Sequence, residues 1–137
     1  MSGRARPEVA VGAIVVDAEE LLLVRRAQPP AAGTWAVPGG RVEGGETLAE
    51  AVVRELDEET GLEGACGALV GWSEILDEGR HAVILDFRVH IMARTPLRAG
   101  DDAAEARWVP LGDVAELRLA PGLAELLHDH GVIDTIL

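Results

Sequence analysis

The sequence predicts one compact α/β domain that spans residues 1–137. Three observations support this fold class. Short apolar, β-branched runs bounded by turn-forming residues indicate strands. One segment in the first half of the chain has helix-start and helix-stop signals, and a segment near the C-terminus has a helical apolar pattern. The sequence also contains no internal repeat, low-complexity tract or linker that would divide it.

The N-terminal part of the chain contains two predicted strands. Val9–Val16 is a short β-branched apolar run that indicates a buried strand. Asp17–Glu20 is a polar turn, and Leu21–Arg26 follows as a second strand, so we expect a hairpin. Farther along, Pro38 favours extended geometry at the residue before it, and Gly39-Gly40 lets the backbone turn sharply or approach a ligand closely.

The best-defined element is a helix from Leu48 to about Thr60. Thr47 and Glu50 match a capping box, in which each residue's side chain accepts a hydrogen bond from the other's backbone N–H. Gly61 stands where a glycine commonly ends a helix.

The second half of the chain is predicted to be mostly strand. Ala65–Ile75, His81–Arg94 and Ala106–Val109 have strand patterns, and Asp77–Gly79 fits a hairpin turn between the first two. Leu123–His130 has a helical apolar pattern and closes the domain.

The charge balance narrows the classes of partner. The formal net charge is −12, from 24 acidic and 12 basic residues, so the surface repels polymeric nucleic acid and anionic membranes. A small phosphorylated substrate is compatible with this charge if a divalent metal and local arginines neutralise it. The single cysteine, Cys66, excludes an internal disulfide and fits a reducing compartment. With no secretory h-region and no apolar run near 18 residues, we expect a cytoplasmic protein.

The predicted helix ends in an acidic run, R-E-L-D-E-E-T-G-L, that opposes its own dipole. Carboxylates in a last helical turn cost about 0.3–1 kcal/mol each. At 3.6 residues per turn, Glu55, Glu58 and Glu59 share an arc of about 100° beside the apolar stripe. The remaining acids, which we expect on the opposite, solvated face, are Glu50, Asp57 and, if the helical turn extends back to it, Glu46.

Three carboxylates at the edge of a core repel one another, so either their pKa values rise or hard cations keep them ionised. Mg²⁺ and Mn²⁺ prefer such oxygen ligands. Arg54 lies next to the arc and could orient Glu58 through an ion pair. The alternative from the residues alone is a solvated acidic helix end that binds no ligand.

The longer pattern resembles the Nudix box. Gly40 is followed after five residues by Glu46, and after seven more by Arg54-Glu55-Leu56-Asp57-Glu58-Glu59-Thr60-Gly61-Leu62, which fills every fixed position of that motif. Three further stretches also look like Nudix proteins, although they are less specific; they are Leu22–Arg26, Gly33–Gly40 and Glu105–Leu111.

This resemblance implies a Nudix-type α/β/α sandwich, with a mixed sheet between helices, and metal-dependent hydrolysis of a nucleoside diphosphate derivative. It implies that Mg²⁺ or Mn²⁺ is bound by Glu55, Glu58 and Glu59, together with the backbone carbonyl of Gly39. Either Glu55 or Glu59 would activate the attacking water. Arg54 would hold a glutamate in place, and Glu46 would be mainly structural.

Four other residues are candidates, each with a structural alternative. In some relatives a glutamate in the region of Glu105 joins the metal site or acts as base. The alternative is that Glu105 is a surface acid. Arg25 and Arg26 end a strand, so one of them would reach a phosphate while the other stays in solvent. Trp35 either stacks on a base or ribose or packs in its loop.

ADP-ribose or a related sugar nucleotide is the favoured substrate, because the Leu22–Arg26, Gly33–Trp35 and Arg107–Leu111 stretches look like those of ADP-ribose pyrophosphatases. A MutT-like pyrophosphohydrolase of (d)NTPs, which sanitises the nucleotide pool, is the first alternative. A non-catalytic nucleotide-binding sensor is the second. We expect a small nucleotide as substrate, no polymeric nucleic acid or membrane as partner, and a monomer or homodimer.

Overall fold

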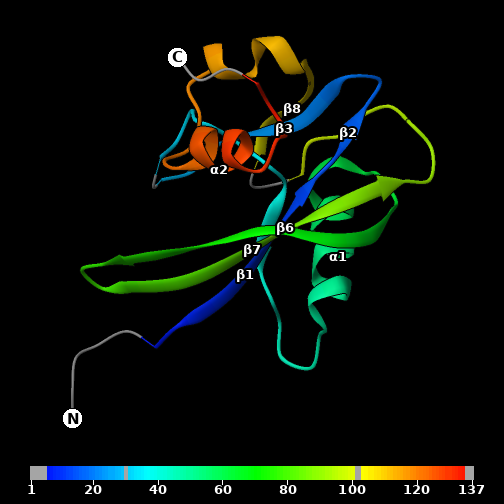
Figure 1. The fold of residues 1–137 in the computed structure, drawn as a ribbon. Coiled ribbons are helices and arrows are strands. Elements are labelled where there is room, and N and C mark those ends of the chain that lie inside the picture. Colours follow the sequence, from blue (N-terminus) through cyan, green and yellow to red (C-terminus); the bar gives the residue numbers. More distant parts are fainter. Residues whose placement is uncertain (1–5, 30, 101–102, 135–137) are drawn as a thin grey trace.

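The strands of the computed structural model form two four-stranded sheets within the residues that the structure describes, 6–29, 31–100 and 103–134 (Figure 1). The first sheet has the order β5 (Gly39–Arg41), β1 (Glu8–Ile14), β7 (Arg80–Ile91) and β6 (Gly64–Asp77). It is mixed, because β1 runs parallel to β7 while its other pairs are antiparallel. In the second sheet, β3 (Glu20–Arg26) pairs with β2 (Val16–Asp17), β4 (Trp35–Ala36) and β8 (Ala103–Pro110).

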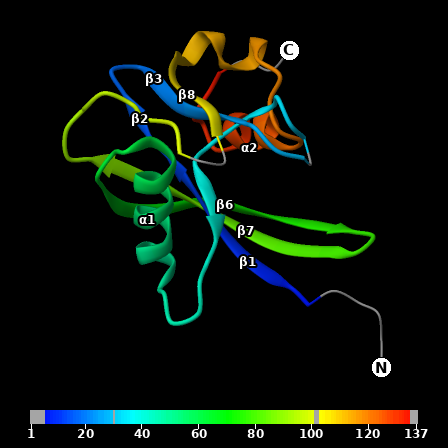
Figure 2. The ribbon, with the colours of Figure 1, turned by 180° about the vertical axis from the view of Figure 1, so that it is seen from behind.

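Two α-helices cover opposite sides of the first sheet (Figures 1 and 2). They are α1 (Leu48–Thr60) and α2 (Leu123–Asp129), and a short 3-10 helix, η1 (Leu111–Glu116), follows β8. Alternate residues of β1 face opposite ways, so Val11 and Ala13 join the core under α1 whereas Ile14 joins the core under α2. The predicted α/β fold with a mixed sheet between helices is confirmed.

Local signals placed the ends of α1 correctly. The Thr47 hydroxyl accepts a hydrogen bond from the Glu50 N–H at 3.1 Å, and a Glu50 carboxylate oxygen accepts one from the Thr47 N–H at 2.8 Å. Gly61 has a φ of 78°, in the left-handed region, and its N–H donates to the Asp57 carbonyl at 2.8 Å. No basic residue occupies the last turn.

The predicted N-terminal hairpin is wrong in its partners. β1 ends at Ile14 and pairs with β5 and β7, and it is the two-residue β2 that forms the hairpin with β3. The chain therefore leaves one sheet and enters the other in the middle of a single apolar run. Both sheets bury their strands, so both halves of the run are apolar and the pattern cannot mark the crossing.

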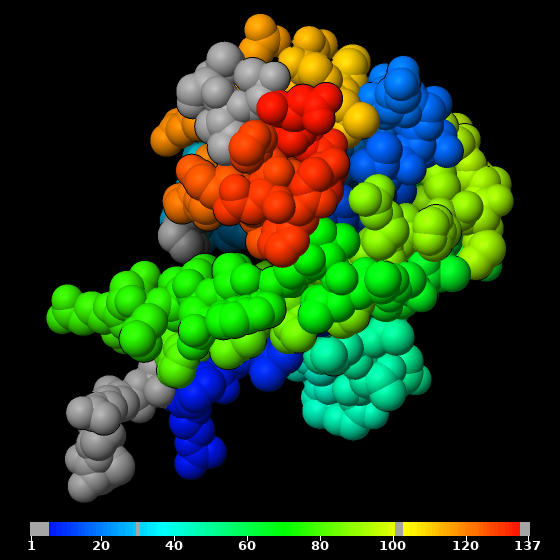
Figure 3. All heavy atoms as spheres, viewed as in Figure 1, coloured from blue at the N-terminus to red at the C-terminus, as the bar shows by residue number. Residues whose placement is uncertain are grey.

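The later elements follow the prediction with shifted ends. β6 and β7 form the predicted hairpin, with Gly79 at a φ of 81° in its turn. This hairpin projects past the rest of the molecule (Figure 3). Trp72 of β6 is 62% exposed. β7 ends at Ile91, short of Arg94, whose guanidinium bonds instead to Asp17 and Glu20. No helix in the described ranges is long and apolar enough to cross a membrane.

One buried carboxyl lies outside the acidic helix. Asp86 on β7 is 5% exposed, and a Cβ on its cross-strand partner Gly12 would come within 2.0 Å of its Oδ1. A Cβ at Gly12 would therefore displace the Asp86 carboxyl. Burial raises the pKa of Asp86 to about 6, and the charge of His130 at the end of α2 partly opposes this rise.

Asp86→Asn is expected to become more stabilising, relative to the wild type, as the pH rises from 4.5 to 7.5. The folded protein holds the Asp86 proton more tightly than the unfolded chain, so wild-type stability falls as the pH passes from the usual pKa of 3.8 to about 6. The change should be about 2 kcal/mol between these two pH values. Urea unfolding at both pH values measures it, with the exposed Asp113→Asn as control. A constant difference between Asp86→Asn and wild type would contradict it.

Candidate active site

The acidic face of α1 lies against the glycine pair of β5. The Gly39 N–H donates to the Glu59 Oε2 at 2.6 Å. A Cβ on Gly40 would lie 2.6 Å from the Glu55 Oε2, so the Glu55 carboxylate rests directly on the Gly40 backbone. Of the two uses predicted for Gly39-Gly40, close approach of the backbone is the one observed, although the approaching group is a carboxylate of the chain itself.

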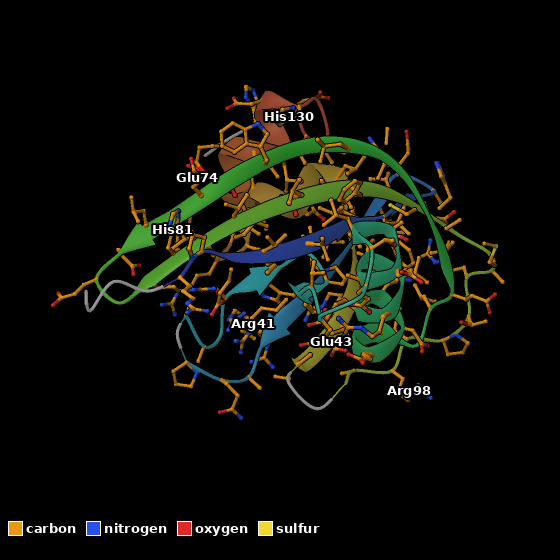
Figure 4. The ribbon with its side chains drawn as sticks, turned by 90° about the horizontal axis from the view of Figure 1, so that it is seen from below. Arg41, Glu43, Glu74, His81, Arg98 and His130 are labelled. Carbon is orange, nitrogen blue, oxygen red and sulfur yellow. The ribbon has the colours of Figure 1, made fainter. Side chains whose placement is uncertain are left out.

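Arg54 joins the carboxylates of this region into one network. Its guanidinium donates to Glu55 at 2.8 Å and to Glu58 at 3.1 Å. It also donates to both oxygens of Glu46, at 2.6 and 3.0 Å, and to the Arg41 carbonyl at 3.1 Å. Figure 4 shows Arg41 and Glu43 on the segment that leads from β5 toward α1. The geometry thus agrees with the expectation that Arg54 orients Glu58.

The helical turn does not extend back to Glu46, so this residue does not share the solvated face of the helix. Its side chain is only 16% exposed, since it lies before the helix begins and folds back onto Arg54. Helical angles do not extend to such a residue. Glu50 and Asp57, which are within the helix, are exposed as expected. The Nudix resemblance implied a structural role for Glu46, and its two hydrogen bonds from Arg54 agree with that role.

Two carboxyls of this network, those of Glu55 and Glu46, have pKa values shifted in opposite directions. Burial raises the pKa of Glu55, while the hydrogen bond and charge of Arg54 work against this rise. Hydrogen bonds from Arg54 and from the Glu43 backbone lower the pKa of Glu46 to about 2. Glu58 adds to the rise at Glu55 through charge repulsion, which is the mutual effect expected for this face.

A pocket of about 750 Å³ opens beside this network. Glu55, Glu59, Gly39 and Gly40 contribute to its wall. Four arginines also line it, two from β3 and one each from β5 and β7: Arg25, Arg26, Arg41 and Arg80. The pocket therefore places acidic residues, which suit a cation, next to arginines, which suit phosphate.

Of the remaining predicted residues, Arg25 and Arg26 are part of the described pocket wall and Glu105 is not. Arg25 and Arg26 both line the pocket, and the Arg25 guanidinium lies over the Trp35 ring at 5.9 Å; that one of the two reaches a phosphate stays a prediction. A shift in strand register lies between these two residues, which breaks the strict alternation of their side chains. Glu105 is half-exposed, pairs with Arg25 at 3.6 Å and is absent from the described pocket wall. Its role in catalysis stays a prediction.

Trp35 has the position of a packing residue. It is 7% exposed and belongs to the core under α2, and the Arg107 guanidinium covers its ring at 4.7 Å. Its neighbours Ala36 and Val37 line the pocket, whereas Trp35 is not part of the described wall. This geometry favours the packing alternative over stacking on a substrate.

Two arginines of the pocket, Arg41 and Arg80, were not predicted from the sequence. Arg41 follows the glycine pair directly, and that adjacency was an available signal. Arg80 begins the strand after a hairpin turn, and nothing in its local sequence distinguishes it from a surface residue. It reaches the pocket because β7 pairs with β1, a contact between distant parts of the chain.

The candidate ligand groups suit a hard divalent cation, but they are not arranged as a complete metal site. Among the described residues, no group of three or more acidic, histidine or cysteine side chains converges in metal-binding geometry. Instead, the Glu59 carboxylate bonds to the Gly39 N–H, and those of Glu55 and Glu58 bond to Arg54. All available ligand atoms are oxygens, as Mg²⁺ and Mn²⁺ prefer, and adjacent groups hold each carboxylate in place.

The model of the NUDIX domain matches residues 6–130. The chain belongs to the Nudix family. It is 41% identical to an ADP-ribose pyrophosphatase of Methanocaldococcus jannaschii over 113 residues, which cover 81% of this chain and 66% of that protein. It is 36% identical to a putative 8-oxo-dGTP diphosphatase 2 of Mycobacterium tuberculosis over 118 residues, covering 83% and 81% of the two chains. This chain spans just under two thirds of the first relative.

Solved Nudix structures have the same fold. The crystal structure of a MutT NUDIX hydrolase from Burkholderia pseudomallei superposes with a TM-score of 0.79 at 29% identity, over 90% of this chain and 98% of that one. The Nudix resemblance of the motif is thereby confirmed, and the protein is a Nudix hydrolase. Nudix hydrolases act on small nucleotides and generally use divalent metals.

Proposed function

We propose that this Nudix hydrolase cleaves the pyrophosphate linkage of a small nucleoside diphosphate derivative in a metal-dependent reaction, with ADP-ribose or a related sugar nucleotide as the favoured substrate. The observation that carries the proposal is the pocket in which Glu55 and Glu59 share a wall with four arginines. The arginines match the charge of a diphosphate, and the carboxylates match that of a cation.

The residues that would hold Mg²⁺ or Mn²⁺ are Glu55, Glu58, Glu59 and the carbonyl of Gly39. The bound ion would neutralise phosphate charge and lower the pKa of a coordinated water. Arg54 holds Glu55 and Glu58 by its hydrogen bonds, which limits the reorganisation needed for binding. Arg25 and Arg26 would orient the phosphates, and either Glu55 or Glu59 would take the proton of the attacking water.

The preference for ADP-ribose or a related sugar nucleotide is supported by the relative from Methanocaldococcus jannaschii, whose name states that activity. The similarity to the putative 8-oxo-dGTP diphosphatase from Mycobacterium tuberculosis favours a MutT-like (d)NTP pyrophosphohydrolase as the second candidate. A non-catalytic sensor would bind nucleotide in the same pocket without turnover. The predicted single domain, oligomeric state and cytoplasmic location stay predictions.

A nucleotide screen tests the proposal. The wild type, Glu58→Gln and Glu59→Gln are incubated with ADP-ribose, sugar nucleotides, dNTPs and 8-oxo-dGTP, each with Mg²⁺, Mn²⁺ or EDTA. We expect wild-type release of nucleoside monophosphate in Mg²⁺ or Mn²⁺ and none in EDTA. Tight nucleotide binding without hydrolysis across the panel would favour the sensor. Equal rates in the wild type and both variants would refute the assigned site.

A further inference from the structure

The C-terminal end of α1 carries the proposed metal ligands and also needs hydrogen-bond donors. The last carbonyls of a helix have no partner within it, and here no basic residue lies in the last turn. The Gly61 N–H satisfies only the Asp57 carbonyl. The carbonyls of Glu58, Glu59 and Thr60 have no hydrogen-bond donor within the helix.

A distant segment, residues 97–100, covers this end of the helix, and we call it the strap. The Arg98 N–H donates to the Thr60 carbonyl at 2.9 Å, and the Gly100 N–H donates to the Glu59 carbonyl at 3.2 Å. Arg98, labelled in Figure 4, packs its side chain against Gly61. Leu97 anchors the other end of the strap by packing against the core under α1.

Gly100 leaves no room for a side chain between the strap and the helix. A Cβ at this position would lie 2.2 Å from the Glu58 carbonyl oxygen and 3.2 Å from the Glu59 Cα. These are backbone atoms, so neither can swing aside as a side-chain tip can. The backbone of Gly100 is outside the positive-φ region, and the need for glycine is therefore one of space.

The strap also connects the helix end with the pocket. The Ala103 N–H donates to the Gly100 carbonyl at 3.2 Å, and Ala103 lines the pocket. Through Gly100, the strap is thus hydrogen-bonded both to the Glu59 backbone at the helix end and to the pocket residue Ala103.

We propose that the strap is a positioning element for the metal ligands Glu58 and Glu59, and that Gly100 is its positioning residue. This inference rests on the proposed function, because it requires those glutamates to bind metal. A helix end without its carbonyl partners frays, and fraying moves the carboxylates of its last turn relative to Gly39. Close contact by Gly100 holds that turn in one position.

Binding of Mn²⁺ without substrate, measured by electron paramagnetic resonance of the free ion, tests the proposal. Gly100→Ala is expected to weaken Mn²⁺ affinity by about 10–100-fold, the usual loss when the support of a metal ligand is disturbed, because its Cβ would push the Glu58 carbonyl aside. Gly112→Ala is the matched control, because a Cβ there meets nothing within 4 Å, and it should bind Mn²⁺ like the wild type. Equal affinity in all three proteins would overturn the inference.

Hydrogen exchange of the wild type tests the strap even if Gly100→Ala fails to fold. If metal binds only when the strap is closed, metal at 100 times its Kd slows exchange through strap opening by about 100-fold. We expect Mg²⁺ to slow the Arg98 and Gly100 amides to this extent, and to slow the Gly131 amide at the end of α2 less. Unchanged rates at Arg98 and Gly100 would overturn the inference.

The two experiments separate this inference from the proposed function. A wild type that binds no Mn²⁺ would refute the metal site, and the role of the strap would fall with it. A wild type that binds Mn²⁺ and hydrolyses nucleotide, with Gly100→Ala equal to it in affinity, would refute only the strap.

Discussion

Glu59→Gln is expected to lower kcat/KM for the hydrolysed nucleotide by about 10²–10³-fold, as loss of one charged group at a reacting centre commonly does. The Glu59 carboxylate lines the pocket and accepts a hydrogen bond from the Gly39 N–H at 2.6 Å. Glutamine has the same length, and its carbonyl oxygen can still accept that hydrogen bond. The substitution therefore removes the negative charge while it preserves the shape of the site. Steady-state kinetics over a range of Mg²⁺ concentrations measure the effect.

Asp57→Asn is the matched control for this substitution. Asp57 lies two residues away on the same helix, but its side chain is exposed and absent from the described pocket wall. It should retain wild-type kinetics. If Glu59→Gln and Asp57→Asn have the same kcat/KM, the negative charge of Glu59 has no part in the reaction. Thermal unfolding in EDTA checks that both variants fold as the wild type does.

Arg54→Ala is expected to destabilise the protein by about 2 kcal/mol, because it removes the donor of several partly buried, charged hydrogen bonds and leaves their acceptors uncompensated. The side chains of Glu46 and Glu55 are 16% and 13% exposed, so water cannot fully replace the lost guanidinium. Arg54→Lys should lose less stability, because the charge remains while the fork that reaches several carboxylates is lost. Urea unfolding in EDTA isolates this effect from metal binding.

The control for Arg54 is an arginine in an exposed pair. Arg41 is 75% exposed on its side chain and lies 3.5 Å from Glu8, so Arg41→Ala should cost less than about 1 kcal/mol. The difference in the loss of unfolding free energy between the two alanine variants measures how much more the Arg54 network stabilises the protein than an exposed ion pair does. Equal losses in Arg54→Ala and Arg41→Ala would show that the network contributes no more than a surface ion pair.

Much of α1 and its acidic face was predictable because the signals are local. A capping box and a terminal glycine act within a few residues of each helix end, and both are present in the structure. The period of the helix separated Glu55 and Glu59, which line the pocket, from Asp57, which is exposed. These predictions needed no knowledge of how the rest of the chain folds.

Contacts between distant segments were beyond the reach of such patterns. An apolar run looks the same whether it stays in one sheet or crosses between two, so the exchange after Ile14 was missed. Glu46 precedes the helix, and only the folded loop brings it to Arg54. Trp35 sits between glycine-rich turns in the sequence, yet packing of distant elements places it in a core.

The sequence by itself determined the family, the acidic helix and the shared face of Glu55 and Glu59, because spacing along one helix sets their angles. Only the tertiary structure decided what surrounds that face. Pairing of β1 with β5 and β7 brings Arg41 and Arg80 into the pocket, and the strap reaches the helix end from residues 97–100. Both depend on strand pairing and packing between segments far apart in the chain, which no local pattern of residues records.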